Sequence, residues 1–363
     1  MRDSREAINA MIRGEPIRPV VAPLWDGIFG AALVGKRYAS DVTVDEKLEV
    51  AERCGFDPIL QLDPGMLWAG VEALQPETDV EQDGDVRVIT STLRSPAGTI
   101  GTVAQEPPHA GGTCIRDATG SDLVYDVLEW FDNEVLRHRD LILAEAKKLA
   151  AEYGGRAALV SGWMTPFELS FMAYPTVITS YLDHRDRHRE LMELHIAVVN
   201  MIMEVAGEAG WDGFSTAGPP IELVGMNMYE EVAVPYLIRY REMAHEHGLW
   251  FRFHNCGHIR GLLEAGTYNR VRPDLFETLA PPPMGELDDL RWAREQLDPA
   301  ICTRGNMDLE FLKHAPPADI ARRTSRILDE TAGYKHIVAA ADEILAHTPV
   351  ENVRAMVEAT AGV

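Results

Sequence analysis

The chain has 363 residues, of which 46% are hydrophobic and 25% charged, a composition typical of a soluble globular protein. Its formal net charge of -23 at pH 7 repels phosphate backbones and anionic lipid headgroups, so we expect neither nucleic acid nor a membrane surface as a partner. No apolar stretch approaches the ~20 residues that a membrane-spanning helix needs, and we predict a cytoplasmic protein with four reduced cysteines.

Taken from the N-terminus, apolar and β-branched runs predict eight strands separated mostly by helical stretches. The predicted strands are residues 19–24, 58–62, 157–161, 212–216, 249–256, 275–279, 300–304 and 336–341. The predicted helical segments are an N-terminal amphipathic segment, 44–53, 121–153, 183–210, 228–248, 286–297, 317–333 and a closing segment from about 349.

A different pattern lies between the second and third of these strands. Residues 86–93 and 98–103 are rich in β-branched side chains and flank Ser95-Pro-Ala-Gly98, which is typical of a β-hairpin. We therefore expect a hairpin insertion over about 84–106, placed so that it could cover one end of the main domain.

Eight alternating β and α units favour one TIM (β/α)8 barrel domain over residues 1–363, with the hairpin as an insertion. A doubly wound sheet is the main alternative. Such a sheet usually carries a glycine-rich phosphate loop after its first strand, and Trp25-Asp26-Gly27 is not one.

In a barrel, the side chains at the carboxyl ends of the strands meet at one rim, where the active site lies. The residues expected at this rim are Trp25, Asp26, Asp63, Trp163, Thr216, His254, Cys256, Asn306 and Asp342.

This set contains candidate zinc ligands. His254 and Cys256 lie two residues apart on a strand and so project from the same face. A catalytic zinc takes three protein ligands and leaves one position open. Asp342, at the end of the eighth strand, is the candidate for the third, and Cys302, which lies inside its strand, is the alternative.

Other residues at or near the rim are candidates for binding a substrate. Trp25 and Trp163 could line a pocket for a flat or apolar molecule, or simply fill the barrel, and Asp63 lies beside them at the rim. Glu222, in the loop after the fourth strand, could accept a proton or be a solvated carboxylate. Asn306 could hold a substrate carbonyl or cap the next helix.

Several motifs together resemble the uroporphyrinogen decarboxylase superfamily, and within it the zinc-dependent, cobalamin-linked methyltransferases. The matching segments are Ala10-Met-Ile-Arg-Gly-Glu-Pro16, Arg18-Pro-Val20, Ser161-Gly-Trp-Met-Thr-Pro-Phe167, Gly210-Trp-Asp-Gly213, Pro235-Tyr236, His254-Asn-Cys-Gly257, Gly305-Asn-Met-Asp308 and Thr348-Pro-Val-Glu-Asn352. Each is weak alone, but the last three form a fairly specific combination spread along the chain.

The resemblance implies a TIM barrel and a zinc held by His254, Cys256 and a second cysteine shortly before the Thr-Pro segment. This sequence has Asp342 at that position, and an aspartate makes the site harder and favours an oxygen-bearing substrate over a thiol. The decarboxylase branch grips its polycarboxylate substrate with an arginine-rich N-terminal segment, whereas residues 25–30 contain no arginine.

We therefore expect a zinc-dependent methyltransferase in which His254, Cys256 and Asp342 hold the catalytic Zn²⁺. It would move a methyl group between a small methylated donor, such as a methoxy compound or methanol, and a corrinoid (cobalamin) on a partner protein or a thiol. The hairpin could help to dock that partner. The alternatives are a metal-free decarboxylase or lyase on the same scaffold, and a binding protein without activity.

Overall fold

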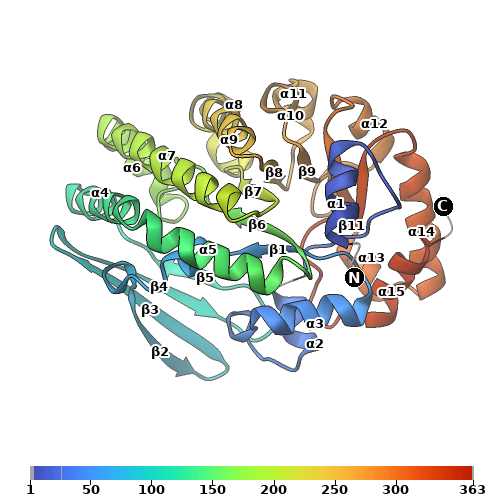
Figure 1. The fold of residues 1–363 in the computed structure, drawn as a ribbon, viewed down its shortest axis with the longest axis horizontal. Coiled ribbons are helices and arrows are strands. Elements are labelled where there is room, and N and C mark those ends of the chain that lie inside the picture. Colours follow the sequence, from blue (N-terminus) through green and yellow to red (C-terminus); the bar gives the residue numbers. More distant parts are fainter. Residues whose placement is uncertain (1–3, 26, 362–363) are drawn as a thin grey trace.

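The computed structural model describes residues 4–25 and 27–361 of the chain (Figure 1). Its centre is a curled sheet of seven parallel strands surrounded by helices, as in a TIM-like barrel. In sheet order the strands are β1 (Ile59–Leu62), β6 (Ala158–Gly162), β7 (Gly213–Ala217), β8 (Trp250–Asn255), β9 (Leu275–Thr278), β10 (Cys302–Met307) and β11 (His336–Ala340). Because each neighbouring pair in this sheet is parallel, every strand ends at the same rim.

The predicted first strand, residues 19–24, forms isolated parallel bridges from Val21 to Val338 and from Leu24 to Glu343. On its other side, the backbone N–H of Asp57 donates to the carbonyl oxygen of Val21 at 2.7 Å. The segment thus lies between β11 and the start of β1, in the position of an eighth strand. It is not a continuous strand because prolines at 19 and 23 remove two of its N–H donors.

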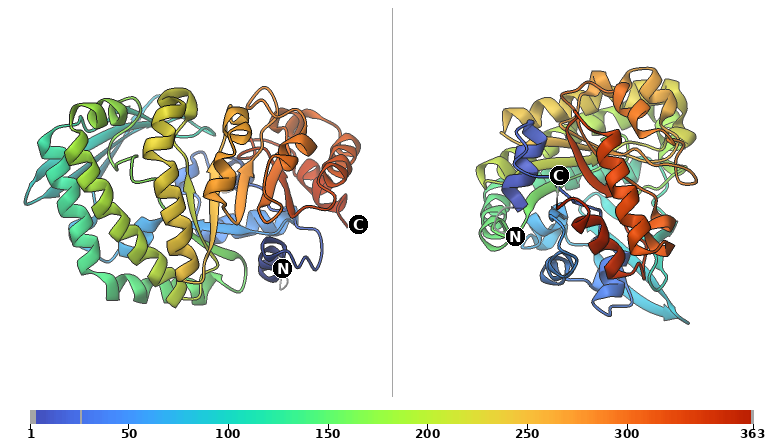
Figure 2. Two further views of the ribbon diagram at one scale, coloured as in Figure 1. Left: turned by 90° about the horizontal axis from the view of Figure 1, so that it is seen from above. Right: turned by 90° about the vertical axis from the view of Figure 1, so that its right-hand side faces the viewer.

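Helices cover the outside of the sheet (Figures 1 and 2). The α-helices are α1 (Ser4–Arg13), α2 (Ile28–Leu33), α3 (Val44–Cys54), α4 (Asp122–Arg137), α5 (Arg139–Tyr153), α6 (Thr176–Asp183), α7 (Arg185–Glu208), α8 (Ile221–Val232), α9 (Val234–Glu246), α10 (Arg260–Glu264), α11 (Thr267–Val271), α12 (Leu290–Glu295), α13 (Leu309–His314), α14 (Pro317–Glu330) and α15 (Val350–Glu358). Short 3₁₀ turns occur at η1 (Ala39–Asp41), η2 (Pro64–Trp68) and η3 (Glu72–Leu74).

Inside the curled sheet the side chains form layers, because alternate residues of each strand face inward. The layer nearest the start of the strands is apolar and packs against α1, which covers that end of the barrel. Its members include Ile59, Ala158, Val160, Leu275, Cys302 and Ile337, with Ala7, Ile8, Met11 and Ile12 from α1.

The predicted hairpin belongs to a larger antiparallel sheet than expected. It comprises β2 (Glu77–Asp83), β3 (Val86–Ser95), β4 (Gly98–Glu106) and β5 (Thr113–Arg116), in that order. The outer strands β2 and β5 are exposed along their whole length, so neither has the alternating apolar residues that identify a strand in sequence. The inserted sheet follows β1 and precedes β6 along the chain, and it projects from one side of the barrel (Figure 1).

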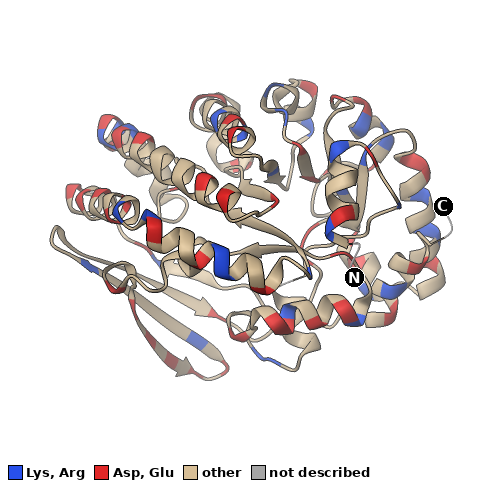
Figure 3. Cartoon of the chain, viewed as in Figure 1, with Lys and Arg blue, Asp and Glu red and all other residues tan. Residues whose placement is uncertain are grey.

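Charged side chains are spread over the outer helices and the inserted sheet, with acidic residues in the majority (Figure 3). Within residues 4–25 and 27–361, no helix combines the length and the apolar character needed to cross a membrane.

Candidate metal centre and substrate cavity

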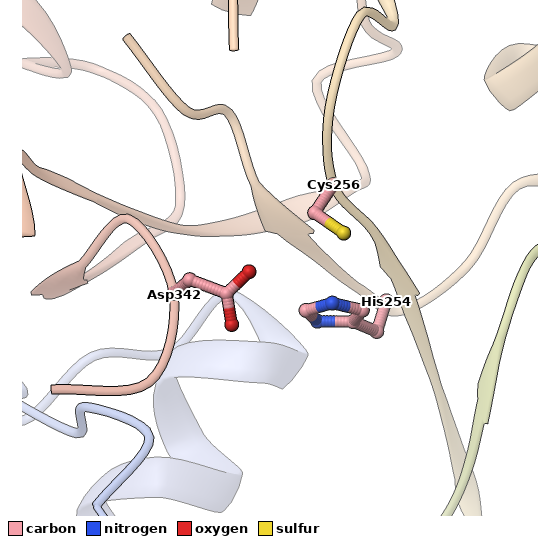
Figure 4. Close-up of side chains that lie close together, drawn as sticks. All are labelled: His254, Cys256 and Asp342. Carbon is pink, nitrogen blue, oxygen red and sulfur yellow. The ribbon is translucent and has the colours of Figure 1, made fainter. Parts of the chain in front are cut away.

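Three side chains that can bind a metal converge at the carboxyl ends of the strands (Figure 4). His254 lies on β8, Cys256 directly follows that strand, and Asp342 lies two residues beyond the end of β11. One nitrogen, one sulfur and one oxygen atom from these residues lie within 4.8 Å of one another. Two strands on different sides of the barrel thus supply one cluster, because both end at the same rim.

His254 is oriented by Glu277 on β9. Nδ1 of the imidazole lies 3.1 Å from Oε1 of Glu277, and only the imidazole can donate to a carboxylate. Nδ1–H therefore donates to Glu277, and Nε2 is the nitrogen at which a metal would take the place of a proton. Burial alone would lower the pKa of His254. Hydrogen bonds with Cys256 and Glu277 and the negative charges of Glu277 and Asp342 raise that pKa to about 10.

Glu277 is a buried carboxylate held between two buried arginines. Nη1 of Arg304 donates to Oε2 of Glu277 at 2.7 Å, and Nε of Arg252 lies 3.8 Å from Oε1. Burial would raise the pKa of Glu277, but the charges of Arg304 and Arg252 and the hydrogen bond from His254 hold it well below its usual value. Glu277 is therefore ionised at neutral pH, and it can keep His254 in the Nδ1–H form.

A cavity of about 540 Å³ opens beside this cluster. Its polar lining includes Gln61, Ser215, Arg252 and Glu277, together with His254 of the cluster. Nε of Arg252 donates to Ser215 Oγ at 2.7 Å, and its Nη2 donates to Gln61 Oε1. The volume is in the range of sites that bind drug-sized small molecules.

The remaining wall of the cavity is mainly apolar. Trp68 and Trp163 line it with ring centroids 5.2 Å apart and planes tilted by 43°, and Leu24 and Met164 extend the wall. Asp63 also borders the cavity, where its carboxylate caps η2 by accepting from the backbone N–H of Gly65 at 2.6 Å. Asp63 and Trp163, the two residues that the sequence placed near a substrate, thus both border this cavity, and their role in binding stays a prediction.

Trp25 does not line the cavity, contrary to expectation. Its side chain is 1% exposed, donates from Nε1 to the carbonyl oxygen of Lys47 at 3.0 Å, and packs edge-on against Phe56. Its neighbour Leu24 faces the cavity instead. Adjacent residues of an extended segment point to opposite sides, so Trp25 faces the helices. Asp26, also expected at the rim, lies outside the described residues.

Asn306 is a structural residue and does not line the cavity. It is 1% exposed, and its Nδ2 donates to the carbonyl oxygen of Leu279 at 3.1 Å. Its Oδ1 accepts from Nη2 of Arg323 on α14 at 3.0 Å. The amide thus joins the end of β10 to the loop after β9 and to an outer helix, and it has no role at the cavity surface.

Glu222 and Cys302 also lie apart from the cavity. Oε1 of Glu222 accepts from the backbone N–H of His258 at 2.9 Å, so this carboxylate holds the turn that follows Cys256. Cys302 is fully buried in the apolar layer against α1, two residues before Arg304 on β10. Asp342, and not Cys302, is therefore the third candidate ligand within reach of His254.

Sequence reasoning missed Gln61, Trp68, Ser215, Arg252 and Glu277, which line the cavity. A signal for two of them was present in the sequence. Arg252 lies two residues before His254 and so faces the same side of β8. Glu277 is a charged residue in the middle of an otherwise buried strand, where a charge needs a partner.

A solved methyltransferase structure shares this architecture. The structure superposes on a methyltransferase from Methanosarcina mazei with a TM-score of 0.66 at 15% sequence identity, over 99% of this chain and 98% of that chain. A B12-independent methionine synthase from Shewanella sp. W3-18-1 gives a TM-score of 0.45 at 12% identity, over 95% and 96% of the two chains. No curated protein matches the chain in sequence. A model of the uroporphyrinogen decarboxylase (URO-D) family matches residues 85–363, which is more than half of the chain, and the protein belongs to this family.

Proposed function

We propose that this protein is a zinc-dependent methyltransferase that transfers a methyl group between a small oxygen-bearing methyl compound and a corrinoid on a partner protein. The observation that carries the proposal is the convergence of His254, Cys256 and Asp342 within 4.8 Å at the edge of a cavity. Three protein ligands and an accessible fourth position are the arrangement of a catalytic zinc site.

The donor set and its surroundings fit zinc. Imidazole nitrogen, thiolate sulfur and carboxylate oxygen are the three ligand types that zinc takes in proteins. Glu277 accepts a hydrogen bond from Nδ1 of His254. A carboxylate that bonds the nitrogen not used for the metal fixes the orientation of a metal-binding histidine ring. Oδ1 of Asp342 accepts from the backbone N–H of Glu343 at 2.7 Å, which positions its carboxylate in the same way.

Bound zinc would supply Lewis acidity at the heteroatom that carries or receives the methyl group. The residues of the chain would bind and orient the substrate. Trp68 and Trp163 would pack against its apolar part, and Ser215, which also lines the cavity, would contact its polar part. A carboxylate ligand in place of a second thiolate leaves the metal harder, which favours an oxygen-bearing substrate.

The methyl acceptor or donor on the other side of the reaction is proposed to be a corrinoid on a separate small protein that approaches the rim. The fold similarity to a methyltransferase from Methanosarcina mazei is consistent with methyl transfer on this scaffold. The inserted sheet projects beside the barrel, and we propose no docking role for it.

Decarboxylation is the second candidate, because the family that the chain belongs to is named for it. The cavity is less suited to a substrate with many carboxylates. Among the described residues that line it, Arg252 is the one arginine and no lysine is present. A metal-free protein that is active on a carboxylated substrate would favour this candidate.

Metal content and methyl transfer together test the proposal. Elemental analysis of protein purified under reducing, chelator-free conditions should find about one zinc per chain. His254→Ala, Cys256→Ala and Asp342→Ala should lose it, whereas Cys114→Ala, an exposed cysteine on β5, should retain it. Zinc-loaded protein should transfer the methyl group of methoxy compounds to reduced corrinoid. The absorbance of the methylcobalamin that forms measures this transfer. Zinc retained in all three variants would contradict the proposed site.

A further inference from the structure

Cys256 lies beyond the regular part of the sheet. It directly follows Asn255, the last residue of β8, and its side chain is exposed. The sulfur of Cys256 nevertheless lies within 4.8 Å of the ligand atoms of His254 and Asp342. A side chain on an exposed turn keeps one position only where the residues on either side of it are held, so those residues decide where the sulfur lies.

The residue before Cys256 is held by two buried phenols. Asn255 is 3% exposed, and its Nδ2 donates to the hydroxyl oxygens of Tyr229 on α8 and Tyr268 on α11 at 2.8 and 2.9 Å. Both tyrosines are fully buried, and the ring of Tyr268 packs against Phe276 of β9 with centroids 4.3 Å apart. The hydroxyl groups cannot shift without disturbing this packing. Asn255 therefore fixes the end of β8 at the point where Cys256 begins.

The turn after Cys256 is held in a different way. Gly257 has a positive φ of 83°, which a glycine adopts without strain. Oε1 of Glu222 on α8 accepts from the backbone N–H of His258 at 2.9 Å, and a Cβ at position 257 would lie only 2.7 Å from the same oxygen. The side chain of Glu222 is 42% exposed. This second support is therefore one hydrogen bond at the surface, next to a glycine that lets the carboxylate approach.

Both supports belong to α8, but a break in the helix lies between them. Gly225 has φ 71° and ψ 162°, which interrupts the helix. Tyr229 follows the break and is buried, whereas Glu222 precedes it and is followed by Leu223, which is 54% exposed. The two supports of Cys256 can therefore be removed independently of each other.

We propose that Asn255 and Glu222 are positioning residues that hold the sulfur of Cys256 where it can reach a metal. Asn255 sets the end of the strand, and Glu222 sets the turn that follows. The thiol is then held beside His254 and Asp342 (Figure 4). The inference rests on the proposed zinc site for what Cys256 does. The supports themselves are contacts within the chain, and the rate at which the thiol reacts reports them without any metal.

Alkylation of Cys256 in metal-free protein tests the first part of the inference. Chelator-treated protein carrying Cys114→Ala is reacted with iodoacetamide, and mass spectrometry of the peptide measures the rate at residue 256. The other two cysteines are buried. We expect Glu222→Ala to react about five-fold faster than the wild type, because loss of the bond to the His258 N–H frees the turn. Glu222→Gln, which keeps an acceptor oxygen, should react as the wild type does.

The same measurement tests Asn255. Asn255→Leu removes both bonds to the phenols and should also react about five-fold faster. Tyr268→Phe removes only one of these bonds and should give an intermediate rate, and it takes the place of Asn255→Leu if that variant does not fold. Glu231→Ala is the control and should react as the wild type does, because this carboxylate lies on α8 but bonds Tyr181 of α6. Melting temperatures are measured in parallel, since a purely structural role would lower them without changing the rate.

Cobalt titration connects the two supports to the metal. Wild-type protein with Co²⁺ should show a sulfur-to-cobalt charge-transfer band, and Glu222→Ala and Asn255→Leu should bind Co²⁺ about 10- to 100-fold more weakly. Rates and affinities equal to those of the wild type in the folded variants would overturn the inference. A Glu222→Gln variant that reacts as fast as Glu222→Ala would also overturn it, because charge and not position would then set the rate. Faster alkylation in the variants of a protein that binds no Co²⁺ would keep the two supports and remove the proposed zinc function.

Discussion

His254 and Glu277 are joined by a contact of 3.1 Å between Nδ1 and Oε1, across the neighbouring strands β8 and β9. The same carboxylate receives Arg304 on its other oxygen. One buried glutamate thus fixes the proton on the candidate metal ligand and neutralises a charge beneath the cavity.

Replacing Glu277 with glutamine should weaken metal binding without removing a ligand. The amide can present either its oxygen or its NH₂ group to Nδ1, so the imidazole would no longer be held in one tautomer. We expect zinc affinity to fall by about 10- to 100-fold, measured by competition with a chromophoric chelator. Glu106→Gln is the control, because Glu106 is equally buried but bonds Ser40 away from the barrel rim. Equal affinities of both variants would remove the supporting role of Glu277.

Asn306 should matter for stability and not for substrate binding. Asn306→Ala leaves the carbonyl oxygen of Leu279 and Nη2 of Arg323 without their partner, so we expect a loss of about 1 to 3 kcal/mol in the free energy of unfolding. Urea denaturation measures this loss, and ligand affinity should stay within about two-fold. A large loss of ligand affinity with unchanged stability would place Asn306 at the cavity after all.

Two tryptophans should separate binding from folding. Trp163→Leu removes one half of the cavity wall and should weaken aromatic ligands by about ten-fold or more. Trp25→Phe should leave that affinity unchanged but lower the melting temperature, because it removes the bond to the Lys47 carbonyl in the core. Calorimetric titration and thermal unfolding of both variants check the pair. The opposite pattern would contradict the side-chain directions described above.

Buried neutral histidines should make the protein sensitive to mild acid. Burial lowers the pKa of His188 to about 4 and that of His336 to about 3. Between these values and the unfolded pKa of about 6.5, only the unfolded chain takes up the protons. The contribution of these two histidines to the free energy of unfolding should therefore be fully present above pH 6.5 and be lost as the pH decreases toward 4.

The contribution of His188 to this pH dependence can be isolated. His188→Gln keeps a group that can donate to the carbonyl oxygen of Phe167, as Nε2 does at 3.1 Å, but it cannot be protonated. Urea denaturation from pH 7 to 4.5 should show a shallower decline for this variant. His314→Gln, at an exposed site on α13, should decline as the wild type does. An unchanged slope in His188→Gln would contradict the assignment.

The sequence allowed the parallel barrel-like sheet to be predicted because its strands are short buried runs between helices, and topology then placed Asp342 beside His254 and Cys256. It did not show which way a rim residue points. Trp25 lies at the expected rim position, but the alternation of the extended segment turns its neighbour Leu24 toward the cavity. The side chain of Asn306 accepts a hydrogen bond from Arg323 on an outer helix, and this partner could be identified only from the fold.

The inserted sheet shows the same limit. Strands β3 and β4 were predicted because they are rich in β-branched residues, whereas β2 is a polar sequence exposed along its whole length. The strand β2 forms because it pairs with β3, and its own composition does not indicate a strand.

X-ray absorption spectroscopy of the zinc-loaded protein tests the central claim most directly, because it counts the ligand types around the metal. We predict a first shell with one sulfur at about 2.3 Å and nitrogen or oxygen ligands at about 2.0 to 2.2 Å. Cys256→Ala should remove the sulfur, and Asp342→Cys should add a second. Two sulfur ligands in the wild type, or none, would contradict a centre built from His254, Cys256 and Asp342.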